Sequence, residues 1–278
     1  MESVRPGVAL VAVRTPTLPP ATHTNSWVLG DGELLVVDPA SPYDDERQRL
    51  LAEVSARLSA GEGLRGLFLT HHHQDHVRGA VHLQQSLRQG GHEVPIIAHP
   101  VTAALLEGSI HVDELWEEPD AREVGGLRLR VLHTPGHAPG HLCLLDEASG
   151  VLVAGDMVAG VGTIAIDPDE GDLGDYLHHL ERLRSLKPTA LLPAHGPVLA
   201  EADAVLAGYI AHRHMRTEQI REALQAHGAQ QPIELAPRVY PQLEGAWLHL
   251  ASRQILTHLH WLQQHGVARP TDLGWVVE

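Results

Sequence analysis

The sequence has 278 residues, 43% of them hydrophobic, and a formal net charge of −15 with histidine neutral. This length suits one or two domains, and no apolar run reaches the roughly 18 residues that a membrane-spanning helix needs, so a soluble globular protein without a membrane partner is expected. The negative charge argues against polyanionic partners such as nucleic acids.

The chain begins Met-Glu-Ser-Val-Arg-Pro, which lacks the basic start, the apolar run and the cleavage site of a secretory signal. A cytoplasmic location is therefore expected. The single cysteine, Cys143, cannot form an internal disulfide and lies in an apolar run typical of a strand, so it is interpreted as a core thiol and not a nucleophile.

Short apolar runs rich in β-branched residues predict strands over residues 8–13, 34–37, 67–69, 96–98, 127–132, 151–154 and 190–192. Between them, apolar residues at three- and four-residue spacing predict helices over 44–58, 77–89, 100–107 and 175–185. Strands and helices mixed in this way indicate an α+β fold with sheets covered by helices.

Beyond about residue 200 the strand signal fades, and helices are predicted over 202–227 and 245–264. The last segment, 267–278, has a turn-like Arg-Pro-Thr-Asp centre between short apolar ends and predicts a hairpin. Helices followed by a hairpin suggest a winged-helix-like arrangement, and a helical cap of no particular family is the alternative. The predicted domains are 1–200 and 201–278.

Histidine is enriched, with 22 residues, and the densest group is the segment Thr-His-His-His-Gln-Asp-His over 70–76. It directly follows the predicted strand at 67–69. In a loop His71 and His73 point to one side, while Asp75 and His76 follow as the chain turns, so one loop can supply two metal ions.

Two other interpretations of this segment are weaker. His72 and His76 have the i, i+4 spacing of a helical zinc protease, but that motif needs glutamate at the position where this chain has His73. A merely polar or tag-like histidine loop is disfavoured by the internal position and by the aspartate within it.

Three more candidates each lie just past a predicted strand: His137 in Pro-Gly-His, Asp156 in Gly-Asp, and His195 in Ala-His-Gly. Taken alone, each is as typical of a turn or a helix cap as of a ligand. Strand ends on one edge of a sandwich converge, however, so their shared context favours a common site.

These motifs resemble those of the metallo-β-lactamase superfamily, whose HxHxDH, PGH, GD and downstream histidine occur here in order over residues 8–200. The resemblance implies an αββα sandwich over 1–200 that binds two divalent ions, with zinc expected and manganese or iron as alternatives. It assigns His71, His73 and His137 to one metal, Asp75, His76 and His195 to the other, and Asp156 as the bridge.

The complete ligand set separates this chain from other branches of the superfamily. True β-lactamases typically lack the bridging Asp156, and mononuclear-iron sulfur dioxygenases do not use His76 and His195, so a hydrolase that is not a β-lactamase is expected. Two metal ions about 3.5 to 4 Å apart can share a water and lower its pKa, which makes a bridging hydroxide the nucleophile. Asp75 is the candidate catalytic residue that orients it or relays its proton.

Residues around the ligands are assigned supporting roles. Asp38, at the end of the strand at 34–37, is placed like the carboxylate that orients a ligating histidine in the superfamily, although a turn or a helix cap explains it equally. Thr70, His72, His99, His133 and His141 are interpreted as structural or as partners of the ligands.

The substrate is indicated only by the helix predicted at 202–227. Tyr209, His212, Arg213 and Arg216 share one face of it, which would bind a carboxylate or phosphate if it faces the metals and is otherwise a solvated stripe. This helix, with Asp175-Tyr176-Leu177 before it and the helical C-terminal region, resembles the subgroup called β-lactamase-like protein 2. That subgroup includes a mitochondrial endoribonuclease that acts on single-stranded RNA and fungal thioesterases that release polyketides from acyl carrier proteins.

Residues 201–278 contain six basic and eight acidic residues, so no basic track for nucleic acid is expected there. The sequence therefore favours hydrolysis of a thioester or ester on a small molecule or an acyl carrier, with cleavage of single-stranded RNA as the alternative. A third hypothesis, a winged-helix nucleic-acid-binding protein with a vestigial metal site, is opposed by the intact ligand set.

Overall fold

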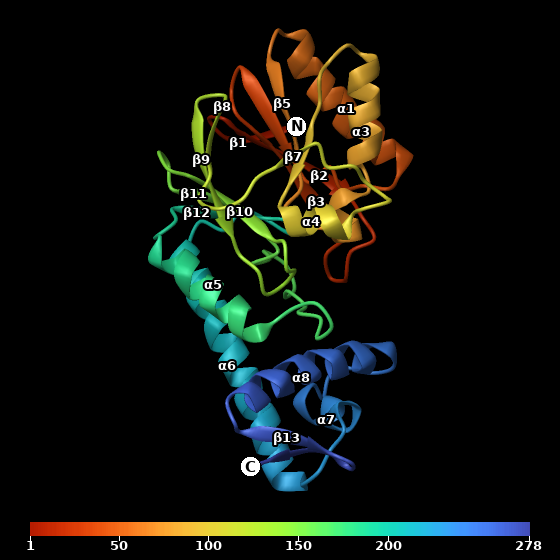
Figure 1. Cartoon of the computed structure of the whole chain (residues 1–278), viewed down its shortest axis with the longest axis vertical. Helices are drawn as coiled ribbons and strands as arrows, with labels where there is room; N and C mark the ends of the chain where they lie inside the picture. The colour runs from red at the N-terminus through yellow and green to blue at the C-terminus, as the bar shows by residue number, and fades with distance from the viewer. The chain divides into compact units, whose positions relative to one another are not determined.

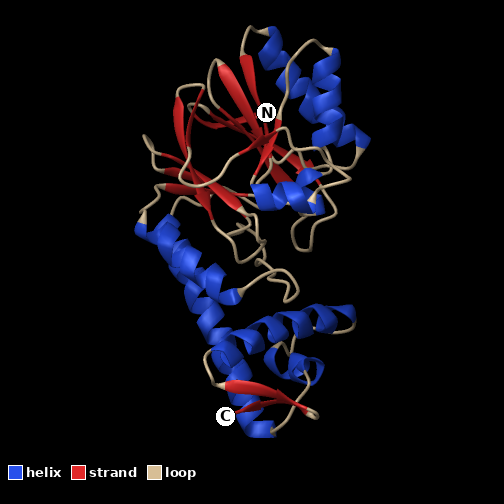
Figure 2. Cartoon of the chain, viewed as in Figure 1, coloured by secondary structure: helices blue, strands red, loops and turns tan.

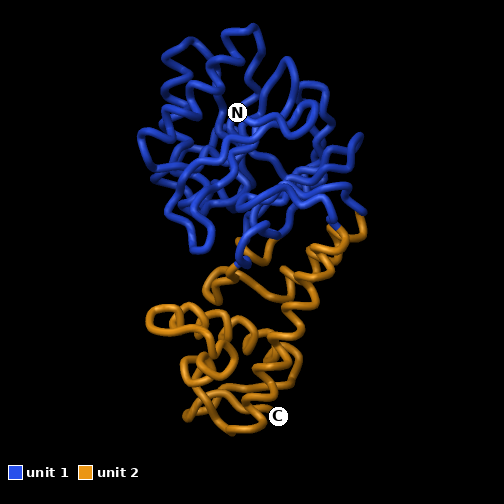
Figure 3. The backbone as a smooth tube through the Cα atoms, turned by 180° about the vertical axis from the view of Figure 1, so that it is seen from behind, with its two compact units in different colours: residues 1–134, 139–164, 187–202 blue, residues 135–138, 165–186, 203–278 orange.

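The computed structural model describes all 278 residues, which form two compact units (Figure 3). The first unit comprises residues 1–134, 139–164 and 187–202, and the second comprises residues 135–138, 165–186 and 203–278. Two segments of the predicted catalytic half, 135–138 and 165–186, thus belong to the second unit.

The first unit contains two sheets (Figure 2). The larger has the order β1 (Glu2–Arg5), β2 (Val8–Arg14), β3 (His23–Leu29), β4 (Glu33–Val37), β5 (Gly63–Phe68), β6 (Ile96–Ala98) and β7 (Glu114–Leu115), with antiparallel pairs up to β4 and parallel pairs after it. The smaller has the order β12 (Ala190–Pro193), β11 (Val151–Gly155), β10 (Leu142–Asp146), β9 (Leu127–His133) and β8 (Ala121–Val124), of which only β11 and β12 pair in parallel.

The helices of the first unit are α1 (Asp44–Ser59), α2 (Gln74–Val77), α3 (Ala80–Gln89) and α4 (Pro100–Leu105), and α1 and α3 lie on one face of the larger sheet (Figure 1). Alternate strand residues face opposite layers. Leu34 is buried with Leu50 and Val54 of α1, whereas its neighbour Leu35 is buried with Leu144 of the smaller sheet. The first unit is therefore layered as helices, sheet, sheet.

The second unit contains α5 (Leu173–Ser185), α6 (Ala202–His227) from its second residue on, α7 (Pro232–Val239), α8 (Ala246–Gln264) and the hairpin of β13 (Ala268–Thr271) and β14 (Gly274–Val277). Its core joins Ile220 of α6, Leu235 of α7, Ile255 of α8 and Trp275 of the hairpin. The predicted terminal hairpin is confirmed. No helix in the chain has both the length and the apolar character needed to cross a membrane.

Most predicted elements are confirmed, with shifted ends. The helix predicted at 77–89 begins three residues later, as α3, and the short helix α2 precedes it; between them, a Cβ on Gly79 would lie 2.3 Å from the carbonyl oxygen of Pro39, so this close approach requires glycine. The helix predicted at 100–107 ends at Leu105. Strands β1, β3, β7 and β8 and helices α2 and α7 were not predicted, and α7 holds prolines at 232 and 237.

Candidate metal centre

Four of the polar residues singled out above follow the ends of parallel strands. Asp38 follows β4, His71 comes soon after β5, Asp156 follows β11, and His195 comes soon after β12. The pairs β4 with β5 and β11 with β12 are parallel, so the carboxyl ends of each pair lie side by side. The sheet topology therefore delivers residues distant in sequence to common edges.

Asp75, His76, Asp156 and His195 converge in the first unit. His76 Nε2 lies 3.6 Å from Asp156 Oδ2 and 3.9 Å from Asp75 Oδ1, and His195 Nε2 lies 3.5 Å from Asp156 Oδ1 and 3.6 Å from Asp75 Oδ2. Each carboxylate thus presents one oxygen to each histidine. The four separations are at or beyond the limit of a hydrogen bond, whereas two ligands about 2.1 Å from one tetrahedral ion are roughly 3.4 Å apart.

The burial of these groups also fits a cation. His76 is fully buried and its Nε2 has no hydrogen-bond partner, and buried polar nitrogens are rarely left in that state. His71, His76 and Asp156 form one group of candidate ligands, and Asp75, His76 and His195 form another, with ligand atoms within 4.8 Å of one another in each. The donor set of imidazole and carboxylate suits a divalent ion such as zinc.

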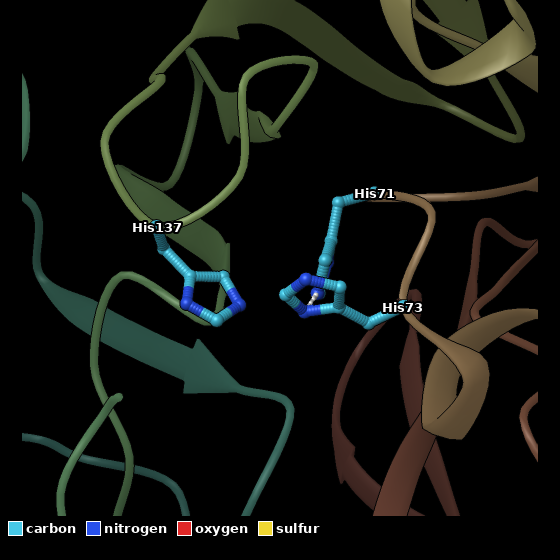
Figure 4. Close-up of side chains that lie close together, drawn as sticks. All are labelled: His71, His73 and His137. Carbon is cyan, nitrogen blue, oxygen red and sulfur yellow. Dashed lines mark hydrogen bonds between the residues drawn. The ribbon is translucent and has the colours of Figure 1, made fainter. Parts of the chain in front are cut away.

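A further group consists of His71, His73 and His137, whose ligand nitrogens also lie within 4.8 Å of one another (Figure 4). His71 Nε2 is 3.0 Å from His73 Nδ1. His137 lies in the segment 135–138 of the second unit, where its Nδ1 donates a hydrogen bond of 2.7 Å to the carbonyl of Ala165. Such a bond fixes the ring orientation and the tautomer of a histidine.

Asp38 orients ligands of both groups. It accepts hydrogen bonds from the backbone N–H of Thr70 at 2.8 Å, from the Thr70 hydroxyl at 2.7 Å and from His76 Nδ1 at 2.8 Å. The Thr70 oxygen in turn lies 3.0 Å from His71 Nδ1. Because a carboxylate only accepts, the proton of neutral His76 is on Nδ1, and the lone pair of Nε2 faces the metal position.

The backbone of Asp38 has a positive φ of 46°. Such a conformation is uncommon for a residue other than glycine, and it persists only where the surroundings impose it. Here the backbone N–H of Asp38 donates to the carbonyl of Phe68, and its own carbonyl accepts from the Ser26 hydroxyl. The strained backbone is therefore held at the point where the side chain meets Thr70 and the candidate ligand His76.

Strand β3, which was not predicted, supports the loops that carry the candidate ligands. The side chains of Thr24, Asn25 and Ser26 are buried and donate hydrogen bonds of 2.6 to 2.9 Å to backbone carbonyls. Their acceptors are the carbonyls of Asp75, Pro193, Gly196 and Asp38. The carbonyl of residue 23 accepts from His195 Nδ1 at 2.9 Å, which again leaves Nε2 free for a ligand role.

His141 fixes the backbone of Asp156. It is fully buried, and its Nε2 accepts from the Asp156 backbone N–H at 3.1 Å while its Nδ1 lies 2.8 Å from the Thr134 hydroxyl. Gly155 must be glycine, because its φ is 50° and a Cβ would lie 2.4 Å from His141 Nε2. From the sequence, His141 was interpreted only as structural or as a partner of the ligands. The structure shows that it contacts the backbone of the candidate ligand Asp156.

The pKa shifts in the metal-free centre are those expected where buried carboxylates need a positive charge beside them. Burial alone would lower the pKa of His76, but the carboxylates of Asp156, Asp38 and Asp75 raise this pKa well above its usual range. Burial would raise the pKa of Asp156, but His195 and His76 hold it well below its usual range. Protons thus balance the buried carboxylates, and a bound dication would displace them.

The predicted substrate residues on α6 have different surroundings. Arg213 is buried, and its guanidinium carbon lies 5.2 Å from the centre of the Tyr176 ring. The backbone N of Tyr176 lies so close to Gly136 that a Cβ there would be 2.3 Å from it, and Gly136 precedes His137. Through Tyr176, contacts inside the second unit therefore place Arg213 near the loop that carries His137.

Arg216 contacts other residues of the second unit. Its Nη1 donates to the carbonyl of Val239 at 3.0 Å and to Gln219 Oε1 at 2.8 Å, and its guanidinium carbon lies 4.4 Å from the centre of the Tyr240 ring. Tyr209 and His212, on the same helix, are half-buried. The four predicted residues are thus not equivalent.

Comparison with known proteins identifies the fold. The family's sequence model, that of the metallo-β-lactamase superfamily, matches residues 19–195, which include every candidate ligand. The chain belongs to this superfamily. The resemblance inferred from its motifs is thereby confirmed, and the chain is a hydrolase of the metallo-β-lactamase fold with mixed sheets.

Among curated superfamily relatives, a β-lactamase-like protein 2 homolog of Caenorhabditis elegans is 29% identical over 220 residues, covering 78% of this chain and 70% of the relative. Its counterpart from Drosophila melanogaster is 27% identical over 260 residues, which cover 88% of this chain and 84% of the relative. An atrochrysone carboxyl ACP thioesterase of Paecilomyces divaricatus is 30% identical over 72% of this chain, but this chain spans only 59% of that protein.

Solved superfamily structures share the fold over nearly the whole chain. A β-lactamase domain protein from Burkholderia ambifaria aligns with a TM-score of 0.86 at 24% identity, covering 99% of this chain and 93% of that one. A metallo-β-lactamase family protein from Thermus thermophilus aligns with a TM-score of 0.79 at 23% identity, covering 99% of this chain and 100% of that one. At these identities the likeness concerns the fold alone.

Proposed function

We propose that this chain is a dinuclear metal-dependent hydrolase of acyl thioesters or esters that carry an anionic group. The observation that carries the proposal is the arrangement of Asp75 and Asp156, each of which presents one oxygen to His76 and the other to His195. Together with the group of three histidines, this arrangement offers ligands for two adjacent ions, which we expect to be zinc, with manganese or iron as alternatives.

Two bound divalent ions supply a Lewis acid for the scissile carbonyl and lower the pKa of a water that attacks it. His71, His73 and His137 would hold one ion, Asp75, His76 and His195 the other, and Asp156 would link them. Asp38 keeps the proton of His76 on Nδ1 and so keeps Nε2 available.

Asp75 is the proposed catalytic carboxylate. Its side chain is 20% exposed and that of Asp156 10%, so Asp75 is the carboxylate more open to solvent and substrate. Its backbone carbonyl is held by the Thr24 hydroxyl, which fixes the place of the side chain. A carboxylate so placed can orient an attacking water and pass its proton toward the leaving group.

The substrate class rests on relatives and on Arg213. The thioesterase relatives act, by their names, on carboxyl groups carried by an acyl carrier protein, and this chain is proposed to share the thioester chemistry. Arg213 is buried near the loop of His137 and would bind a carboxylate or phosphate of the substrate, with Tyr209 and His212 beside it on the same helix. The contacts of Arg216 favour a structural role instead.

We further propose that residues 201–278 form a winged-helix-like domain appended to a catalytic domain over 1–200. The order of α6, α7, α8 and the hairpin supports this assignment. It does not by itself favour RNA as the substrate, since this region has eight acidic and six basic residues, and nucleic-acid binding usually needs a basic track.

The experiment is a hydrolysis panel of acyl thioesters, lactones, phosphodiesters and single-stranded RNA, run on the parent and on Asp156→Asn in parallel. The proposal expects the thioesters to be cleaved fastest and the variant to lose that activity while it stays folded. Faster cleavage of RNA would assign the endoribonuclease function instead. Inactivity on all four, with salt-sensitive retention of nucleic acid, would favour the non-enzymatic alternative.

A further inference from the structure

A loop of the second unit, residues 165–172, is attached to helix α8. The side-chain amide of Gln254 pairs with the backbone of Ile166: the Ile166 N–H donates to Gln254 Oε1 at 3.0 Å, and Gln254 Nε2 donates to the Ile166 carbonyl at 3.1 Å. The Thr257 hydroxyl donates to the same carbonyl at 2.7 Å. Ile166 is buried, so these bonds satisfy backbone groups that water does not reach.

Ion pairs extend this attachment. Arg253, next to Gln254 on α8, donates from Nε to Asp167 Oδ2 at 2.9 Å and from Nη2 to Asp169 Oδ2 at 2.7 Å. The side chains of Arg253 and Asp167 are both 42% exposed, so solvent screening limits the strength of this pair. The amide pairing of Gln254, which is partly buried, is therefore the stronger determinant of where the loop lies.

The same loop holds His137. The carbonyl of Ala165 accepts from His137 Nδ1 at 2.7 Å, and the N–H of Asp172 donates to the carbonyl of Gly136 at 2.9 Å. The Ala165 carbonyl and the Ile166 N–H belong to one peptide unit, which is planar. Gln254 binds the N–H at one edge of this planar unit and His137 binds the C=O at the opposite edge, so the orientation of the peptide couples the two side chains.

We propose that Gln254 is a positioning residue for His137, and that α8 thereby sets the metal affinity of the group formed by His71, His73 and His137. The inference rests on the proposed two-metal function. Without Gln254 the Ile166 N–H loses its acceptor, so the peptide between residues 165 and 166 is held less firmly and the Ala165 carbonyl no longer fixes the His137 ring as closely. Changes to such outer partners of a ligating histidine typically weaken metal binding about 10- to 100-fold.

The test is a titration of the metal-free full-length chain with Zn²⁺ against a chromophoric chelator, for the parent and for Gln254→Met. Methionine keeps the length of the side chain and removes both hydrogen bonds. The control is Gln263→Met, the same change at an exposed glutamine of the same helix. We expect Gln254→Met to weaken one of the two ions about 10- to 100-fold and to leave the other unchanged, and the control to change neither.

A double-mutant cycle with His137→Ala separates positioning from general destabilisation. In the His137→Ala background, Gln254→Met should weaken neither ion further. Equal weakening of both ions, unchanged affinities, or a full additional effect in that background would overturn the inference while leaving the two-metal proposal intact. A parent chain that binds no zinc would overturn both.

Discussion

The role of Asp38 makes Asp38→Asn an informative perturbation. Asparagine keeps the shape and one oxygen, which can still accept from the Thr70 backbone N–H. Its NH₂ group then replaces Oδ2, the atom that accepts from His76 Nδ1. A donor now faces a donor, and the conflict is relieved only if the proton of His76 moves from Nδ1 to Nε2, where it blocks the nitrogen that faces the metal position.

The magnitude follows from the bonds that are lost. A hydrogen bond to a charged group contributes about 1.5–3 kcal/mol. Outer partners of ligating histidines are worth 10- to 100-fold in metal affinity, which corresponds to about 1.4–2.7 kcal/mol. We therefore expect Asp38→Asn to weaken the ion bound by His76 about 10- to 100-fold, with a smaller effect on the ion bound by His71, which Asp38 reaches through Thr70.

The assay is a zinc titration of the metal-free variant against a chromophoric chelator, with thermal unfolding measured in parallel. Asp146→Asn is the matched control, because Asp146 is also a buried aspartate of the first unit but accepts hydrogen bonds only within the turn that follows β10. Unchanged zinc affinity in Asp38→Asn, or an equal loss in the control, would refute the reasoning.

Three further predictions concern substrate binding and pH. Arg213→Ala should raise KM for an anionic thioester more than it changes kcat, whereas Arg216→Ala should lower stability and leave KM unchanged; the opposite pattern in steady-state kinetics would exchange their roles. In the metal-free chain the pKa values of His76 and His195 are raised, so the stability that their protonated forms provide is complete below pH 6.5 and is lost as pH rises through the raised values. Its melting temperature should therefore fall above pH 6.5 unless zinc is added, and a rise would contradict the coupling. Burial first, and Arg213 second, lower the pKa of His258 to about 3, so the parent should lose stability as pH falls from 6.5 toward 3. His258→Asn should lose less over that range in denaturant titrations, and equal losses would exclude the effect.

The candidate ligands were accessible to sequence reasoning because strand ends have a local signal. The apolar runs before His71, Asp156 and His195 identify the strands, and the topology of the sheets brings their ends to common edges. A turn or a helix cap needs only one polar residue after such a run, whereas a metal site needs several that converge.

The supporting residues had no such signal. Strand β3 was missed because Thr24, Asn25 and Ser26 are polar where a buried strand is expected to be apolar, and their reason for being there is the carbonyls of three distant loops. The amide of Gln254 gives no sign in the sequence that it pairs with Ile166, since that contact joins residues 88 positions apart. Tertiary hydrogen bonds of this kind become visible only in the structure.

We propose that the chain binds two metal ions and uses them for hydrolysis. The most direct measurement is metal analysis of the zinc-reconstituted chain together with its turnover of an acyl thioester, for the parent and for Asp156→Asn. The account predicts about two ions per parent chain, and a folded variant with weakened metal binding and greatly reduced turnover. A parent that holds no metal after reconstitution, or a variant with undiminished turnover, would contradict it.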